Sequence, residues 1–465
     1  MSDTVSDTKS PPETAQADLT AAAEAFEGPQ KGAAAVSEVI GERIAGYSYV
    51  APPAPGSDVH GLWHYFPCHD RSGYAAHAIA MHAMMQDRLK VPVSLVPTRS
   101  AAIDIDYFPR DRFDMLLRWN KDTCGHPEAM IVSLPPSRES FREWDRTRAF
   151  VMYCAYEATA VSEFAVQICN DDRVTALWCV SPFTARAFID SGVEPGKVFV
   201  LPPPICDGPW LDMLDDTGPA SEPEGIFRFT TMGTWHERKG FHDLIRAYFS
   251  TFKREEPVEL AIRTSSLGDG DTLRKFKERV IDEIASIARA YGDARYPHSM
   301  KMPRIRMLLG TDLTDREVMS WLCKFSDCFV NASYGEGLGI PAMWAAAHGI
   351  PIVSSDFGAV GEFLADAQVA APVGDVLHMF PAKVAPVPTT MLRFNSLFDP
   401  NAQWGSYDVP ELGAAMRRAF SAGRRRNDAL ARYTRSRFSY DRCEHPAAVA
   451  LKFISRPETL ARWGL

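Results

Sequence analysis

One carboxylate, Glu336, lies in a glycine-rich stretch, NASYGEGLGIP, that directly follows a short apolar run. Gly335, Gly337 and Gly339 permit a tight turn and the close approach of a ligand. A helix is predicted to begin near Gly339 or Pro341, since proline is favourable just inside a helix start. The free N–H groups of such a first turn can hold an anion such as a diphosphate. Glu336 is then placed to accept hydrogen bonds from sugar hydroxyls; the alternative is a solvated glutamate in an ordinary strand-to-helix turn.

Two adjacent cations form the second candidate group. Arg238 and Lys239 lie in TTMGTWHERKGFHD, between a predicted strand and a predicted helix. Two cations in such a loop suit a polyphosphate, because charge-assisted hydrogen bonds to phosphate oxygens are strong. The alternative interpretation is an exposed basic turn.

The elements that must position these residues alternate between apolar runs and helical patterns. Runs typical of buried strands are GLWHYFPC, PVSLVP, MIVSLPP, RAFVMYCAY, TALWCVS and KVFVLPPP in one half, and IFRFTTM, VELAIRT, RIRMLLG, DCFVNAS and IPIVSS in the other. Such alternation predicts α/β domains with parallel sheets covered on both faces. Ligands bind beyond the carboxyl ends of such strands, so two facing doubly wound domains would form a cleft between them.

Composition changes suggest the boundaries. We predict a disordered tail over 1–45, because its polar and small residues offer little apolar surface. The expected segments that follow are an N-terminal Rossmann-like domain (58–205), a linker rich in Pro, Gly and acids (206–225), a C-terminal Rossmann-like domain (226–408) and C-terminal helices (409–465).

The composition excludes several classes of protein. The 465 residues carry a net charge of −9 without the basic footprint of a nucleic-acid-binding surface. The nine cysteines are scattered, and Cys154, Cys169 and Cys179 fall in core-like surroundings typical of free thiols. No bilayer-spanning stretch and no signal peptide is evident, so we expect a cytoplasmic protein without an integral membrane segment.

EGLGIPAMWAAAHGIPIVSSDFGAVGE, residues 336–362, resembles the signature of family 4 retaining glycosyltransferases, which have the two-domain GT-B fold. The resemblance implies that Glu336 contacts the donor sugar. It also implies that the closing glycine turn is formed by Gly358 and Glu362, the latter in the nucleotide ribose region. The backbone amides expected to serve the sugar and the diphosphate are those around Gly337, Leu338, Gly339 and Ile340.

A second match places Lys239 on the family lysine that binds the donor diphosphate. Thr234 stands where an arginine is usual, and Arg238 is expected to substitute for it. In the N-terminal half, Gly73 matches a glycine loop that approaches the donor phosphate. Glu157, at the end of a predicted strand, either meets the acceptor or caps an element.

Two departures from the family pattern are visible. Ser133 and Pro135 stand where some members carry a histidine, so no acid or base is assigned in this half. Trp344 replaces a second glutamate that accepts bonds from the ribose hydroxyls, and tryptophan has a donor but no acceptor. The Trp344 ring either packs on the ribose or fills core space.

The predicted activity is transfer of a sugar from a nucleoside diphosphate donor to an acceptor hydroxyl, with retention as the family implies. We expect no metal and no cofactor beyond the sugar nucleotide co-substrate, because no DxD-like motif lies near the basic loop. Two alternatives remain: a non-catalytic member that binds glycans or partners, and a sugar-nucleotide epimerase, which would need strong acid and base residues in the cleft.

Overall fold

The computed structural model describes residues 59–67, 72–97, 124–136, 147–215, 225–266, 273–291, 302–309, 315–394 and 397–465. The predicted tail, 1–45, lies outside these ranges. So do residues 216–224 of the expected linker.

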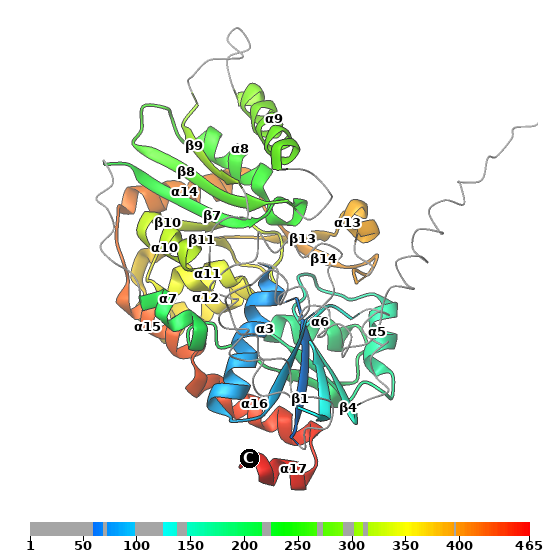
Figure 1. The fold of residues 1–465 in the computed structure, drawn as a ribbon. Helices are drawn as coiled ribbons and strands as arrows, with labels where there is room; N and C mark the ends of the chain where they lie inside the picture. Colours follow the sequence, from blue (N-terminus) through cyan, green and yellow to red (C-terminus); the bar gives the residue numbers. More distant parts are fainter. Residues whose placement is uncertain are drawn as a thin grey trace, which may run out of the picture. The chain divides into compact units, whose positions relative to one another are not determined.

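The first half of the chain forms a six-stranded parallel sheet with the order β2-β1-β3-β4-β5-β6 (Figure 1). Its strands are β1 (His60–Phe66), β2 (Val93–Pro97), β3 (His126–Val132), β4 (Ala149–Cys154), β5 (Ala176–Cys179) and β6 (Val198–Val200). The main helices are α3 (Gly73–Ala83), α5 (Glu163–Asn170) and α6 (Pro182–Asp190). All six residues of β4 are buried, as expected for a central strand covered on both faces. Cys154, Cys169 and Cys179 are buried free thiols.

A second six-stranded parallel sheet has the order β12-β11-β10-β7-β8-β9. Its strands are β7 (Phe227–Thr234), β8 (Val258–Ser265), β9 (Arg304–Leu309), β10 (Cys328–Asn331), β11 (Ile352–Ser355) and β12 (Leu377–Phe380). Its helices are α8 (Phe241–Thr251), α9 (Leu273–Tyr291), α10 (Asp315–Phe325), α11 (Ile340–Ala347) and α12 (Gly358–Ala370). Two parallel-sheet α/β domains are therefore present, which confirms the predicted fold class.

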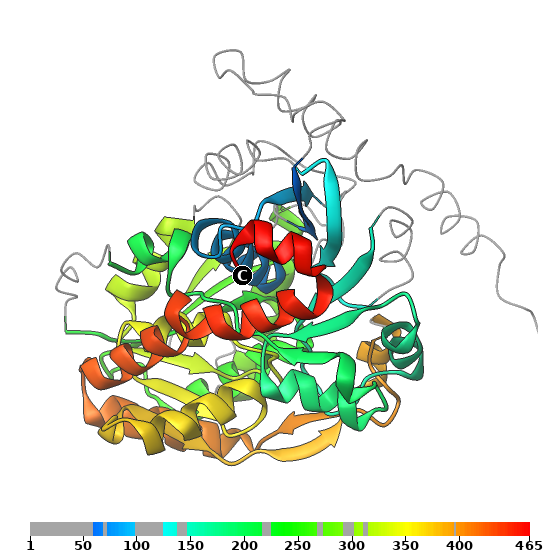
Figure 2. The ribbon, with the colours of Figure 1, turned by 90° about the horizontal axis from the view of Figure 1, so that it is seen from below.

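The C-terminal helices pack against both domains. α14 (Val409–Ala422) packs on α8, and α15 (Asp428–Arg437) packs on α11 and α12. α16 (Tyr440–Ile454) and α17 (Pro457–Trp463) return to the first sheet, as Figure 2 shows. There the Trp463 indole N–H donates to the carbonyl of His60 at 3.2 Å, and Arg88 pairs with Asp441 at 2.9 Å. The end of the chain therefore fastens the first domain.

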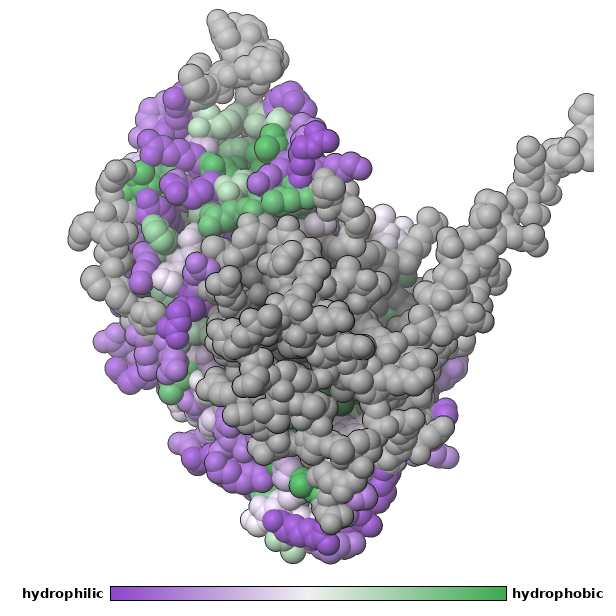
Figure 3. All heavy atoms as spheres, in the orientation of Figure 1, coloured by the Kyte–Doolittle hydropathy of each residue, from purple (hydrophilic) through white to green (hydrophobic). Residues whose placement is uncertain are grey.

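Part of the expected linker is folded. Trp210 is buried in a 3-10 turn, and α7 (Leu211–Asp215) follows it. Asp215 of α7 pairs with Arg435 of α15 at 2.6 Å. Hydrophilic residues dominate the surface over α7 and α15 (Figure 3).

A hairpin that the sequence analysis did not predict follows β12. β13 (Lys383–Pro386) pairs antiparallel with β14 (Gln403–Ser406), and α13 (Thr389–Phe394) lies between them. The segment contacts the first domain, because the amide of Thr159 donates to the carbonyl of Gln403 and the amide of Ser162 to that of Leu397, both at 2.8 Å. It thus joins the two domains beside the loop that follows β4.

Two histidines are buried on α3, and we expect them to make the free energy of unfolding depend on pH. Burial lowers the pKa of His77 and of His82 from 6.5 to about 3. Both are neutral in the folded state, whereas the unfolded chain binds protons below about pH 6.5. The free energy of unfolding should therefore fall as the pH drops, and these two groups should contribute about 2–3 kcal/mol of the fall between pH 7 and 5.5, at roughly 1.4 kcal/mol per unit for each group.

Urea unfolding at a series of pH values measures this slope. His77→Phe should reduce the fall between pH 7 and 5.5 by about 1–1.5 kcal/mol, while replacement of the exposed His445 by Gln should leave it unchanged. A slope equal to wild type in His77→Phe would show that His77 is not the titrating group.

Candidate active site

The glycine turn between β10 and α11 positions Glu336. Gly339 has φ +74°, a left-handed conformation that favours glycine, and Pro341 lies in the first turn of α11 as predicted. A Cβ at Gly335 would lie 1.9 Å from the carbonyl oxygen of Glu157, so only glycine allows this approach to the first domain. The turn is therefore held directly against the loop after β4.

The backbone amides at the start of α11 lack acceptors within the part of the chain that the structure describes. Among the described residues, no hydrogen bond is donated by the amides of Gly337, Leu338, Gly339 and Ile340. Free N–H groups at a helix N-terminus attract anions. The carbonyl of Gly337 faces the other way and accepts from the Ser181 hydroxyl of the first domain at 2.6 Å.

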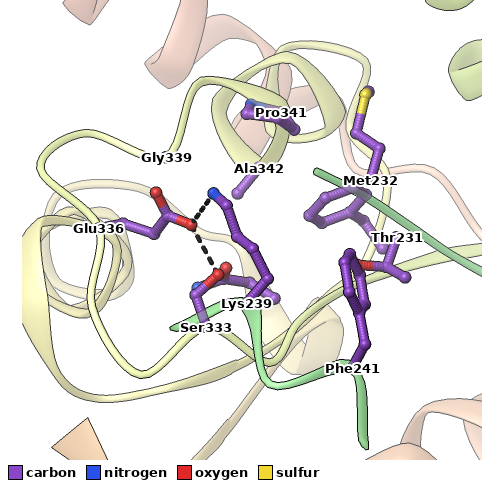
Figure 4. Close-up of a pocket in the computed structure, with 11 residues that line it drawn as sticks. Thr231, Met232, Lys239, Phe241, Ser333, Glu336, Gly339, Pro341 and Ala342 are labelled. Atoms are coloured by element: carbon purple, nitrogen blue, oxygen red, sulfur yellow. Dashed lines mark hydrogen bonds and ion pairs between the residues drawn. The ribbon is translucent and has the colours of Figure 1, made fainter. Parts of the chain in front are cut away.

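The Glu336 carboxylate is mostly buried and is held by charged partners. Lys239 Nζ donates to Oε1 at 2.5 Å, the Ser333 hydroxyl donates to the same oxygen at 2.6 Å, and Arg238 Nη1 lies 3.3 Å from Oε2. Figure 4 shows the carboxylate facing Lys239 and Ser333. Burial would raise the pKa of Glu336, but Lys239 and Arg238 overcome it and lower the pKa to about 2. The solvated-glutamate alternative is therefore wrong, and the group is a carboxylate at any working pH.

Arg238 and Lys239 lie in a 3-10 turn, Glu237–Lys239, between β7 and α8. Their side chains are only 17% and 16% exposed, so the exposed basic turn of the alternative interpretation is wrong. Arg238 Nη1 also donates to the carbonyl of Gly335 at 2.7 Å, and the amide of Tyr334 donates to the Arg238 carbonyl at 2.8 Å. The basic loop and the glycine turn are thus one connected unit.

A small pocket opens beside this unit. Figure 4 shows the side chains that line it, from β7, β10, the start of α8 and the start of α11. The lining combines both signs of charge with apolar groups: Thr231, Met232, Lys239, Phe241, Phe329, Asn331, Ser333, Glu336, Gly339, Pro341 and Ala342. The arrangement can hold a polar ligand that presents hydroxyls to a carboxylate and an anion to a cation.

The first domain contributes Glu157 and the start of α3. Glu157 Oε1 lies 3.3 Å from Arg238 Nη2, across the two domains. Gly73 is the first residue of α3, capped by Ser72, and the neighbouring Tyr74 hydroxyl donates to the carbonyl of Ala155 at 2.8 Å. The negative charge of Glu157 contributes to raising the pKa of Tyr74, after the larger effect of burial. The start of α3 therefore lies close to Glu157 and Arg238, and it is the segment that the sequence analysis matched to a glycine loop.

Trp344 and Glu362 do not join this group. The Trp344 ring is buried 5.1 Å from the ring of Trp210, and its N–H donates to the carbonyl of Ile205 at 3.1 Å, as the core-packing alternative describes. Glu362 lies on α12 rather than in a glycine turn, and it pairs with Arg186 of α6. Burial raises the pKa of Glu362 despite this partner.

Sequence reasoning missed Ser333 and Ser181. Ser333 lies two residues after the end of β10 and three residues before Glu336, and that spacing was the available signal for it. Ser181 is the N-cap of α6 and reaches Gly337 across 156 residues of sequence, which no local pattern reports.

Within the described ranges, no three His, Cys, Asp or Glu side chains cluster so as to hold a metal ion. None of the described helices combines enough length with enough apolar character to cross a bilayer.

Part of the chain matches a known protein family, and the whole fold is similar to solved structures. Residues 227–385, which contain the basic loop and the glycine turn, match the family described as Glycosyl transferases group 1. No curated protein matches the sequence. A glycosyltransferase from Rickettsia africae has a similar structure, with 11% identity, a TM-score of 0.50 and coverage of 85% of this chain and 99% of that one. Anabaena Alr3699/HepE in complex with UDP-glucose is similar at 11% identity and TM-score 0.47, covering 87% of this chain and 98% of that one.

The fold is therefore GT-B, with two parallel-sheet domains whose carboxyl-end loops meet. The match to the family of group 1 glycosyl transferases lies in the second of these domains.

Proposed function

We propose that the protein transfers a sugar, with retained anomeric configuration, from a nucleoside diphosphate donor to an acceptor hydroxyl. The observation that carries the proposal is the meeting of three groups around the glycine turn that borders the pocket. These are the Glu336 carboxylate, the Arg238 and Lys239 cations, and the free amides at the start of α11. A sugar nucleotide offers the complementary pair of hydroxyls and diphosphate.

In this proposal, the bond between the anomeric carbon and the diphosphate breaks, and the diphosphate leaves with the electron pair. Arg238, Lys239 and the α11 amides stabilise the departing charge, because fixed donors in a site that excludes water act strongly. Glu336 accepts hydrogen bonds from the sugar and supports positive charge developing on its ring. The acceptor oxygen then bonds to the anomeric carbon, and its proton passes to an oxygen of the departing diphosphate.

Because Glu336 is paired with Lys239, the donor sugar has to bind a carboxylate that already has hydrogen-bond partners. The Glu336 carboxylate accepts from Lys239 and Ser333. A carboxylate oxygen has further lone pairs, so it can accept from a sugar hydroxyl while it keeps these partners. Gly73, at the start of α3, is proposed to approach the phosphate from the opposite domain.

Lys239→Ala tests the donor site. Loss of the ammonium should weaken both nucleoside diphosphate and sugar nucleotide binding about 10- to 100-fold, since a charge-assisted hydrogen bond contributes roughly 1.5–3 kcal/mol. Titration calorimetry against a panel of nucleoside diphosphates measures this, with thermal melting as a check on folding. Lys253→Ala, at an exposed position in the same domain, is the matched control.

Equal affinity in wild type and Lys239→Ala would show that Lys239 does not bind the diphosphate.

A second measurement separates an enzyme from a non-catalytic binding protein. Slow release of nucleoside diphosphate from a sugar nucleotide without acceptor indicates catalysis, whereas tight binding of every donor with no release indicates a binding protein.

A further inference from the structure

Arg238 is shared by carboxylates from both domains. Its Nη1 lies 3.3 Å from Glu336 of the second domain, and its Nη2 lies 3.3 Å from Glu157 of the first. The Glu157 side chain is only 18% exposed. Its backbone carbonyl lies close to Gly335 of the second domain, so the backbone from which the carboxylate extends is held beside the glycine turn.

The charges of this cluster cancel before any ligand arrives. Arg238 and Lys239 supply two cations, and Glu157 and Glu336 supply two carboxylates. A diphosphate that enters adds negative charge to a site that is already neutral and mostly removed from water. Like charges repel strongly there, because the effective dielectric constant is low.

The two carboxylates differ in what else holds them. Glu336 is bound by Lys239 and Ser333 as well as by Arg238. Within the described residues, the Glu157 carboxylate contacts Arg238 and no other hydrogen-bond donor or cation. Glu157 is therefore the carboxylate that can leave Arg238 without breaking other contacts.

We propose that Glu157 is an internal counter-anion that occupies Arg238 until the donor diphosphate displaces it. The inference rests on the proposed function, since it assigns the anion-binding role to Arg238. Glu157 keeps the buried guanidinium neutralised in the donor-free protein and lowers the affinity for the diphosphate. Donor binding also breaks one charged contact between the two domains.

The consequence is a gain of affinity on removal of a site residue. Glu157→Gln keeps the size of the side chain and removes its charge, so inorganic pyrophosphate should bind at least tenfold more tightly than to wild type. The ligand-free variant should melt at a lower temperature, because Arg238 loses a partner, and pyrophosphate should raise its melting temperature more than that of wild type. If Glu157 had only a structural role, its replacement would lower the melting temperature without increasing the affinity for pyrophosphate.

Calorimetry and thermal melting of the full chain with inorganic pyrophosphate test this. Glu163→Gln is the matched control, since it removes the same charge from an exposed position of the same domain, where the carboxylate contacts Gln167. Glu157→Ala is a second variant in case Gln perturbs the turn. Tighter binding in both Glu157 variants, with Glu163→Gln like wild type, supports the proposal.

Two outcomes overturn it in distinguishable ways. If wild type binds pyrophosphate, Lys239→Ala weakens that binding and the Glu157 variants bind no more tightly than wild type, the counter-anion role is wrong while the donor site stands. If pyrophosphate and nucleoside diphosphates bind neither wild type nor any variant, the proposed function and this inference both fail.

Discussion

Glu336→Gln is expected to lower turnover of sugar transfer by a factor of ten to a thousand, roughly 1.4–4 kcal/mol in activation free energy. Gln keeps the size of the side chain but removes the charge that holds the sugar hydroxyls and supports positive charge on the ring. The loss should not change with pH above about 5, because the pKa of Glu336 is about 2 and the wild-type group is ionised throughout. Steady-state kinetics with a sugar nucleotide and an acceptor measure it.

Nucleoside diphosphate affinity separates this effect from a damaged site. Glu336 neutralises Lys239 and Arg238, so removing its charge leaves more positive charge for the diphosphate, and affinity should not fall. Glu163→Gln again serves as the charge control. Full transfer activity in Glu336→Gln would mean that the donor site is misplaced and would favour a non-catalytic role for this pocket.

Trp344→Ala is expected to lower the free energy of unfolding by about 3–5 kcal/mol, the range for deleting a buried large aromatic ring. The ring fills the space between α11 and the segment before α7, where it packs against Trp210. Its truncation leaves a cavity and also leaves the carbonyl of Ile205 without its indole donor. Urea unfolding with an unchanged m-value measures the loss.

Trp344→Phe is the intermediate control. It retains an aromatic ring and loses the hydrogen bond, so its destabilisation should be smaller, about 1–3 kcal/mol. Nucleoside diphosphate affinity of the folded Trp344→Ala protein should equal that of wild type. A large drop in that affinity, with little loss of stability, would instead place the ring on the ribose.

The sequence by itself determined the fold class and the local geometry around Glu336. Apolar runs of strand length separated by helical patterns predicted the two parallel sheets, because burial on both faces leaves a continuous apolar pattern in each strand. Glycines and Pro341 predicted the turn and the start of α11, since these residues fix backbone conformation locally. Adjacent cations in a strand-to-helix loop were visible as Arg238 and Lys239 without any structure.

Other local features were not predicted. α12 was taken for a glycine turn followed by Glu362, although residues 358–370 form a helix. The hairpin of β13 and β14 was missed because its strands have only four residues each, and β13 is largely exposed and ends in Pro386. Hydrogen bonds to the loop after β4 fix the position of the hairpin, and its own sequence pattern does not predict these bonds.

Only the tertiary structure decided which charges meet. Glu336 and Lys239 are 97 residues apart, and Trp344 is 139 residues from the carbonyl it contacts. Sequence periodicity reports the face on which a side chain lies, not the partner that another element brings to it. The Arg238 cluster is buried, Glu157 contacts Arg238 and Trp344 lies in the core because two sheets from different halves of the chain meet at their carboxyl-end loops.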